Sequence, residues 1–389
     1  MNTDIHFLGS TNARPPFRQF GIKPSDRLSH LYIVGKTGVG KTTLLENLII
    51  QDIKKGNGCA LLDPHGDMVE RINSRVTSHW EIDNSKVVYL NAPDERQPYG
   101  YNPVRPVNTS LRPLLASGML EVFKKLWNEA WGVRMEHIFR NVLHTLLDQP
   151  VGSLADIPRL LTNEEFRNKT LHHVSSSYVR EFWEKEFASY RGDAIAPILN
   201  KVGGFLANPT LSRILTEPPE NLSLRQIMDK RQVLLVNLSK GRLGEDASSL
   251  LGGLIFTSLG LSAFSRADMV ASERLPFHTY VDEFQNFTTL ALVNMTSELR
   301  KYGMSLTLAH QYLSQLKPDI RSAVLGNIGT LIVFRVGAED ARPLAKQFEP
   351  VFRAVDLLNL PNHEYYIKLM IEGAPSSPFS ARALPPMSH

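Results

Sequence analysis

HLYIVGKTGVGKTTLLENLI, residues 30–49, joins a strand-like apolar run to a helix-like run through a loop that holds three glycines. The loop matches the phosphate-binding pattern G-x-x-x-x-G-K-[ST] at every fixed position. Its glycines let main-chain N–H groups converge on phosphates, Lys41 reaches the outer phosphates, and the Thr42 hydroxyl ligates Mg²⁺. The stretch predicts a nucleotide-binding α/β protein. The candidate nucleotide-binding residues are Gly35, Lys36, Thr37, Gly38, Val39, Gly40, Lys41, Thr42 and Thr43.

The composition is that of an ordinary globular protein. The 389 residues are 42% hydrophobic and 21% charged, which is enough chain for two domains with cores. The net charge of +4 permits contact with nucleic acid but does not argue for it. The single Cys59 lies in an apolar run, so we expect a buried thiol in a cytoplasmic protein. The sequence shows no secretion signal and no run of about eighteen apolar residues, and we expect no membrane span.

Two acidic strand ends compete as the second element of the nucleotide site, at 59–67 and at 277–287. The second, FHTYVDEFQNF, is the better Walker B motif. Asp282 ends a strand-like run and can hold Mg²⁺ through water, and Glu283 is placed to orient or deprotonate the attacking water. We expect Asp282 and Thr42 to be the metal-binding residues and Glu283 to be catalytic.

A further strand is expected at 305–309, and Gln311 follows it closely. If this strand is the neighbour of the one that ends at Asp282, His310-Gln311 puts a polar side chain beside Asp282. Gln311 is then a sensor of the γ-phosphate or of the attacking water.

The earlier acidic segment, Asp63-Pro-His-Gly66, also fits the D-x-x-G pattern of GTPases. No N-K-x-D base-specificity motif follows a strand, since NLSKG at 237–241 and NKVG at 200–203 lack the aspartate. ATP is therefore the expected nucleotide. Asp63, His65 and Asp67 could form a metal site, but a turn with Asp67 near a helix start is the favoured interpretation.

The chain alternates strands and helices with one interruption, which predicts a mainly parallel sheet. Between about residues 102 and 231 only helical spacing is found, and three tryptophans there, Trp127, Trp131 and Trp183, are expected in a core. We therefore expect a first ATPase part at 1–105, an all-helical insertion at 106–230, and a second ATPase part at 231–389 whose Pro-Ser-rich tail runs over the surface or frays. Strands are expected near 30–35, 59–63, 86–91, 232–238, 277–282, 305–309, 329–336 and 365–371.

An ordered set of motifs resembles the HerA/FtsK superfamily, and most of all the TraG/TraD-like conjugative coupling ATPases of type IV secretion. The similarity covers about residues 20–380. It implies a RecA-like P-loop NTPase with an inserted all-α domain, which assembles as a hexameric ring and moves DNA with ATP and Mg²⁺. The motifs are GKTGVGKT, LLDPHGD, YGYNPV, ILNKVGGFLANP, NLSKGRLG, YVDEFQNF, ELRKYGMSLTLAHQYLSQL and GNIGTLIVFRVGAEDA.

The resemblance assigns further roles by position. Lys41, Glu283 and Gln311 keep the roles given above. Arg300, in SELRKYG, matches the segment that offers an arginine to the ATP of a neighbouring subunit, and Arg335 is its rival. Lys240 and Arg242, in SKGRLG, are candidates for contact with DNA phosphates.

This sequence differs from the family pattern at its N-terminus. Coupling proteins usually begin with two membrane helices, whereas this sequence reaches its phosphate-binding loop at residue 35. We expect a coupling ATPase without the anchor, docked peripherally on a membrane complex, with a relaxase or secretion channel as partner. One alternative is a HerA-like translocase that works with a nuclease in DNA processing or defence. Another is an ATPase that exports protein without DNA.

Overall fold

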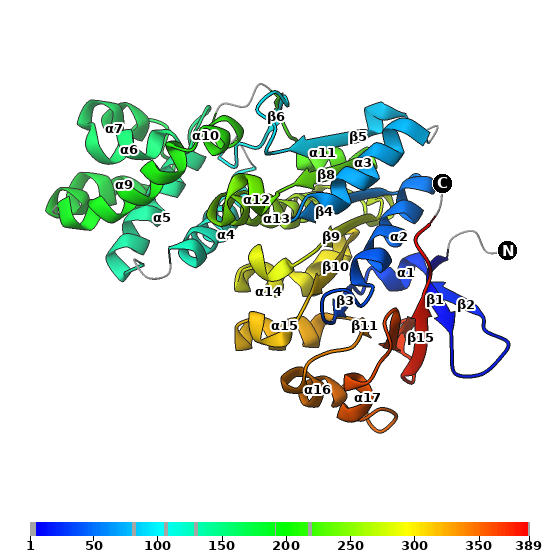
Figure 1. Cartoon of the computed structure of the whole chain (residues 1–389). Coiled ribbons are helices and arrows are strands. Elements are labelled where there is room, and N and C mark those ends of the chain that lie inside the picture. The colour runs from blue at the N-terminus through cyan, green and yellow to red at the C-terminus, as the bar shows by residue number, and fades with distance from the viewer. Residues whose placement is uncertain are drawn as a thin grey trace.

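A computed structural model describes residues 5–79, 83–104, 108–127, 131–190, 192–216 and 220–387. Within these residues, eleven strands form one sheet in the order β2-β1-β15-β12-β11-β3-β10-β9-β4-β8-β5 (Figure 1). The strands are β1 (His6–Thr11), β2 (Gln19–Ile22), β3 (Leu31–Val34), β4 (Gly58–Asp63), β5 (Val87–Asn91), β8 (Val233–Asn237), β9 (Phe277–Val281), β10 (Met304–His310), β11 (Thr330–Val333), β12 (Glu364–Lys368) and β15 (Phe379–Ala383).

The part of the sheet from β11 to β5 is parallel, as the alternation of strands and helices predicts. Alternate residues of each strand face opposite sides of the sheet. Leu31 and Ile33 of β3 belong to the core beneath helices α2 (Lys41–Lys54) and α3 (Asp67–His79), whereas Tyr32 and Val34 belong to the core of the other face. Helices on both faces of a parallel sheet make this the expected α/β class.

The remaining strands form an antiparallel edge, of which the sequence pattern predicted β12, near 365–371, but not β1, β2 or β15. β15, from the C-terminal tail, pairs with β1 on one side and with β12 on the other. The expectation that this tail runs over the surface or frays was therefore wrong for residues 379–383. The segment Phe-Ser-Ala-Arg-Ala alternates inward alanines with outward polar groups, and that short pattern is hidden by the flanking prolines and serines.

Between β5 and β8 the chain is outside the large sheet, and there the short strands β6 (Tyr99–Gly100) and β7 (Glu220–Asn221) pair in parallel as a separate sheet. The helices between them lie at one end of the molecule, away from both termini (Figure 1). Their aromatic side chains pack on one another, and Trp127 and Trp183 are buried as expected while Trp131 is half-buried. The helices are α4 (Arg112–Leu126), α5 (Val133–Leu147), α6 (Asp156–Thr162), α7 (Glu164–Leu171), α8 (Ser177–Glu181), α9 (Gly192–Leu206) and α10 (Pro209–Leu215).

Helix α13 (Glu245–Ser265) joins the helical segment to the sheet, since it packs against α4, α11 (Leu224–Asp229) and α14 (Leu290–Leu299). By length and composition the stretch Glu245–Asp268 could cross a membrane, but 83% of its apolar window is buried inside the protein. An all-round apolar helix of this kind is typical of a protein core. The apolar cluster around it runs without interruption from the sheet face into the helical segment.

Candidate functional site

The phosphate-binding loop lies where the sequence predicts it, between β3 and α2, at the carboxyl edge of the parallel sheet. Gly38 and Gly40 have φ values of 78° and 115°, which side chains rarely adopt. A Cβ atom on Gly40 would also lie 2.9 Å from Nδ1 of His363. The loop thus needs its glycines for both conformation and space, and α2 begins immediately after it at Lys41.

Lys41 is 6% exposed and is held by the loop itself. Its Nζ donates to the carbonyl oxygens of Gly35 at 2.6 Å and of Lys36 at 3.0 Å. Burial lowers the pKa of Lys41, and the negative charges of Asp282 and Glu283 oppose that shift. The ammonium therefore lies between the loop and the acidic pair. Thr42, next along the helix, is exposed, so its hydroxyl is available to a metal ion.

Asp282 and Glu283 follow β9, which is separated from β3 only by β10. Asp282 is buried, and its Oδ1 accepts from the main-chain N–H of Glu283 at 3.0 Å. Burial, with the nearby charges of Glu283 and Asp63, raises the pKa of Asp282 to about 7. A cation beside Asp282 favours its charged form, and the hydroxyl and carboxylate oxygens of Thr42 and Asp282 are the donors that Mg²⁺ prefers.

Glu283 is held on both sides by glutamine side chains. Gln311 donates from Nε2 to Oε1 of Glu283 at 2.7 Å, and Gln285 donates from Nε2 to Oε2 at 2.7 Å. The hydroxyl of Thr37, in the phosphate-binding loop, donates to Oε1 of Gln311 at 3.1 Å. Gln311 therefore links the loop to the glutamate, as expected from the pairing of β10 with β9, although its contact is with Glu283 rather than Asp282. Gln285 was missed in the sequence, where only its place two residues after Glu283 marks it.

Arg300 and Arg335 lie in different places relative to the loop. Arg335 follows β11 beside the loop of the same chain, where its guanidinium donates to Leu360 O at 3.2 Å and to Asn362 Oδ1 at 2.7 Å. Arg300 follows α14 and precedes β10, whereas Gln311 follows the other end of that strand. Seven residues of strand separate the two by roughly 20 Å. The Arg300 side chain is exposed, and no side chain in the described part of the protein pairs with it.

The earlier acidic segment forms a helix start rather than a metal site. Asp63 Oδ2 accepts from the N–H groups of Met68 at 2.9 Å and Val69 at 3.2 Å, at the first turn of α3. Its Oδ1 accepts from the N–H of His65 at 2.9 Å. Within the residues that the structure describes, no group of three His, Cys, Asp or Glu side chains is placed to hold a metal ion.

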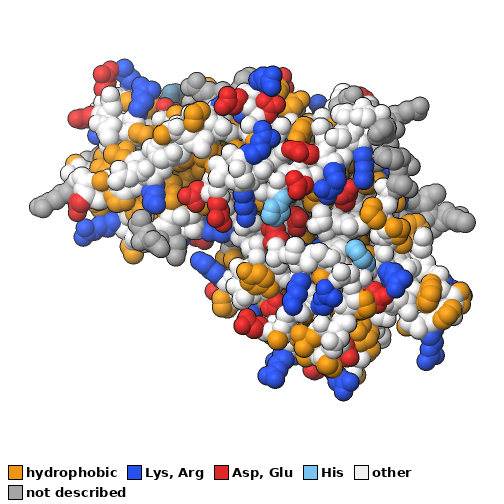
Figure 2. All heavy atoms as spheres, viewed as in Figure 1, with side chains coloured by type: hydrophobic (Ala, Val, Ile, Leu, Met, Phe, Trp, Pro, Cys, Tyr) orange, Lys and Arg blue, Asp and Glu red, His pale blue; other side chains and the backbone are white. Residues whose placement is uncertain are grey.

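Lys240 lies in α12 (Lys240–Leu243) and Arg242 is exposed in the same short helix, after the carboxyl end of β8. They are therefore on the same edge of the sheet as the phosphate-binding loop. On the face of the molecule seen in Figure 2, basic and acidic side chains are interspersed. Charge alone therefore marks no nucleic-acid surface on this face.

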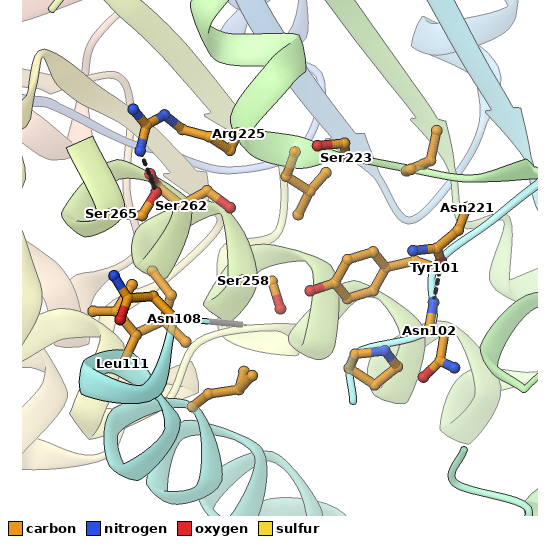
Figure 3. A pocket seen from close by; sticks show the side chains of 15 residues that line it. Tyr101, Asn102, Asn108, Leu111, Asn221, Ser223, Arg225, Ser258, Ser262 and Ser265 are labelled. Carbon is orange, nitrogen blue, oxygen red and sulfur yellow. Dashed lines mark hydrogen bonds between the residues drawn. The ribbon is translucent and has the colours of Figure 1, made fainter. Parts of the chain in front are cut away.

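A cavity of about 360 Å³ lies apart from this site, where both ends of the helical segment meet α13. Figure 3 shows the Tyr101 hydroxyl directed toward Ser258, and Arg225 donating to Ser265 at 2.8 Å. Asn102 donates its N–H to Asn221 Oδ1 at 2.6 Å and so ties the outgoing chain to the returning chain. None of the expected catalytic residues lines this cavity.

Comparison with solved structures shows a shared fold at low sequence identity. The bacterial conjugative coupling protein TrwBdeltaN70 has a TM-score of 0.66 at 16% identity, covering 94% of this chain and 87% of that chain. TrwB in complex with ADP and Mg²⁺ has a TM-score of 0.65 at 17% identity, with the same coverage. VirB4 of Thermoanaerobacter pseudethanolicus has a TM-score of 0.65 at 13% identity, covering 99% of this chain and 97% of that chain. The expected RecA-like fold with an inserted helical domain is confirmed.

No curated protein sequence matches the chain. A protein-family model matches residues 19–351, and this model describes the DNA-binding domain of type IV secretion-system coupling proteins. The match spans the phosphate-binding loop, the helical segment and the acidic pair after β9. This chain therefore belongs to the family of type IV secretion-system coupling protein DNA-binding domains.

Proposed function

We propose that this protein is an ATP-hydrolysing, DNA-translocating coupling ATPase of conjugative transfer. The observation that carries the proposal is the placement of Glu283. Its carboxylate is buried and held between two glutamine side chains, and one of these, Gln311, also contacts the phosphate-binding loop. A protein that only binds nucleotide needs no such oriented base, whereas a hydrolase needs one beside the γ-phosphate.

Each residue of the site has a separate task in this proposal. The main-chain N–H groups of residues 35–43 and the N-terminus of α2 hold the phosphates, and Lys41 neutralises charge on the outer ones. Thr42 and Asp282 hold Mg²⁺, which neutralises the developing charge on the phosphate oxygens. Glu283 accepts the proton of the attacking water, and Gln311 orients that water and senses the outer phosphate.

We assign Arg300 rather than Arg335 to the neighbouring subunit's nucleotide. Arg335 lies beside the loop of its own chain and is bonded there to Leu360 and Asn362. Arg300 is exposed at the opposite end of β10, too far away to reach its own site. An arginine that completes the site from a second copy requires a homo-oligomer. A closed ring repeats that contact without a free end, and a hexameric ring is the assembly that we propose.

The first experiment is the steady-state ATPase rate with and without single- and double-stranded DNA at low salt, with Glu283→Gln as the matched control. We expect DNA to accelerate ATP hydrolysis by the wild type, and we expect the Glu283→Gln variant to hydrolyse no ATP with or without DNA. Hydrolysis that neither DNA form accelerates would instead favour an ATPase that exports protein. A relaxase or a nuclease recovered as the stable partner would separate conjugative transfer from the HerA-like alternative.

The role of Arg300 has its own test. Arg300→Ala should lose ATPase activity alone and regain part of it when mixed with Glu283→Gln, because each variant then supplies the group that the other lacks. Arg335→Ala mixed in the same way should give no such recovery. The reverse pattern would reassign the trans arginine to Arg335.

A further inference from the structure

The loop that follows Glu283 is held from the helical segment by one side chain. Lys125 lies in the last turn of α4, and its Nζ donates to the carbonyl oxygen of Gln285 at 2.5 Å and to that of Thr288 at 3.0 Å. No main-chain N–H of the described residues donates to either carbonyl. Lys125 is therefore the group that satisfies both, and buried carbonyls without a partner would be costly.

The backbone at Glu283 needs this support. Glu283 has φ 45° and ψ 50°, a left-handed conformation that a residue with a side chain adopts at a cost of about 1 kcal/mol or more. Such a conformation persists only where the surroundings fix it. The short turn after it is closed by Asn286, whose N–H and Nδ2 both donate to the carbonyl of Glu283.

Gln285 connects the two contacts. Its main-chain carbonyl accepts from Lys125, and its side-chain Nε2 donates to the carboxylate of Glu283 at 2.7 Å. A displacement of Lys125 therefore moves the residue that orients the glutamate on the side opposite Gln311. The path from α4 to the catalytic carboxylate consists of three residues and two hydrogen bonds.

The Lys125 side chain bonds to these main-chain carbonyls, and no acidic side chain of the described residues forms an ion pair with it. Burial, together with the charges of Lys317 and Lys240, lowers the pKa of Lys125 to about 7. Glu121 and Asp319 line the adjacent cavity of about 290 Å³, yet neither forms an ion pair with Lys125 among the described residues. Its neighbour in α4, Lys124, bonds instead to a glutamate of α5, Glu136, at 3.0 Å and away from the catalytic loop.

We propose that Lys125 is a positioning residue through which the helical segment sets the orientation of Glu283. The proposal rests on the proposed ATPase function, and it adds a route by which a partner or DNA that moves α4 changes the rate of hydrolysis. The route ends at Glu283, and Glu283 reaches the phosphate-binding loop only indirectly, through Gln311 and Thr37. The route should therefore act on turnover more than on nucleotide affinity.

The test compares Lys125→Met with Lys124→Met in the full chain. Both variants replace a lysine of the same helix turn by an uncharged side chain of similar length, but only the first removes the donor to the catalytic loop. We expect Lys125→Met to lower kcat roughly tenfold or more while KM for ATP changes less than about twofold. Lys124→Met should leave both values near those of the wild type. Lys125→Arg keeps a positively charged donor at this position, and the adjacent cavity has space for the larger guanidinium group. This variant should therefore recover most of kcat.

Amide hydrogen exchange of the peptide that spans residues 283–289 gives a readout that does not depend on activity. Lys125→Met should speed exchange there, and Lys124→Met should not. An unchanged kcat and unchanged exchange in Lys125→Met would overturn the inference. Equal losses of kcat in both lysine variants would also overturn it, because the effect would then be a general one of charge or stability. If the wild type hydrolyses no ATP but exchange changes as expected, the proposed function fails and the structural link stands.

Discussion

The carboxyl edge of the sheet and the helical segment are built in different ways. At the edge, buried polar groups such as Lys41, Asp282 and Glu283 each have a defined partner within hydrogen-bonding distance. In the helical segment, buried aromatic and aliphatic side chains pack on one another, and ion pairs such as Lys169 with Glu165 lie on the surface. Substitutions should therefore affect chemistry at the edge and stability in the segment. Besides the apolar packing around α13, the two regions are joined by Lys125, which holds the loop after Glu283.

The largest effect is expected from Lys41→Ala at the edge. In the proposed function the Lys41 ammonium neutralises the outer phosphates. Its removal should therefore lower kcat for ATP by roughly a thousandfold or more. The apolar core is untouched, so the unfolding transition should stay close to that of the wild type. Activity and thermal unfolding measured on the same preparation check this. A variant that unfolds at much lower temperature would show that the edge also carries stability.

The matching change in the helical segment is Phe139→Ala. Phe139 is fully buried in α5 and contacts Phe123, Trp127 and Trp131. Its truncation should lower the free energy of unfolding by about 3–5 kcal/mol through lost burial and a cavity. ATP turnover per folded molecule should remain within about twofold. Val133→Ala, on the same helix at a site that is 88% exposed, is the control and should change neither.

The edge is the more predictable of the two regions. The loop at 35–42 and the acidic pair after β9 can be predicted from the sequence because their chemistry demands particular residues at fixed spacing. The place of Gln311 beside that pair follows from the pairing of β10 with β9. Gln285 could not be predicted, because an amide two residues after a glutamate has no motif and its role depends on a turn with a left-handed residue.

The helical segment was predictable as helices but not in its contacts. Apolar spacing indicated α4, α5 and α9, yet nothing in the sequence indicates that Lys125 reaches main-chain carbonyls 160 and 163 residues later in the chain. The pairing of the antiparallel edge could not be predicted for a related reason. β1 and β15 pair although they come from opposite ends of the chain, and each is too short to reveal its partner.

A smaller effect concerns how the free energy of unfolding depends on pH through a buried histidine of the sheet. His278 is buried in β9, and burial lowers its pKa to about 3. Below about pH 6.5 the unfolded chain binds a proton at this residue and the folded protein does not, so stability present at neutral pH is lost as the pH falls. The contribution is roughly 1.4 kcal/mol per pH unit between pH 6 and 4. Urea unfolding at several pH values gives the slope of the free energy of unfolding against pH, and His278→Gln should make this slope shallower by about that amount. Equal slopes in the variant and the wild type would show that His278 does not bind its proton differently in the folded and unfolded protein.

The smallest effect is expected from the double change of Lys240 and Arg242 to serine, which tests whether the edge also meets DNA. The removal of each contact with a phosphate should lower the slope of log affinity against log salt by about 0.7 to 0.9, with a severalfold weaker affinity at low salt. Stability should change by less than about 0.5 kcal/mol, because these are surface positions. Changing Arg14 and Arg18 to serine, in the exposed loop between β1 and β2, removes the same charge far from the site. If that control lowers the slope equally, the binding is a response to net charge, and the contact with DNA does not belong to α12.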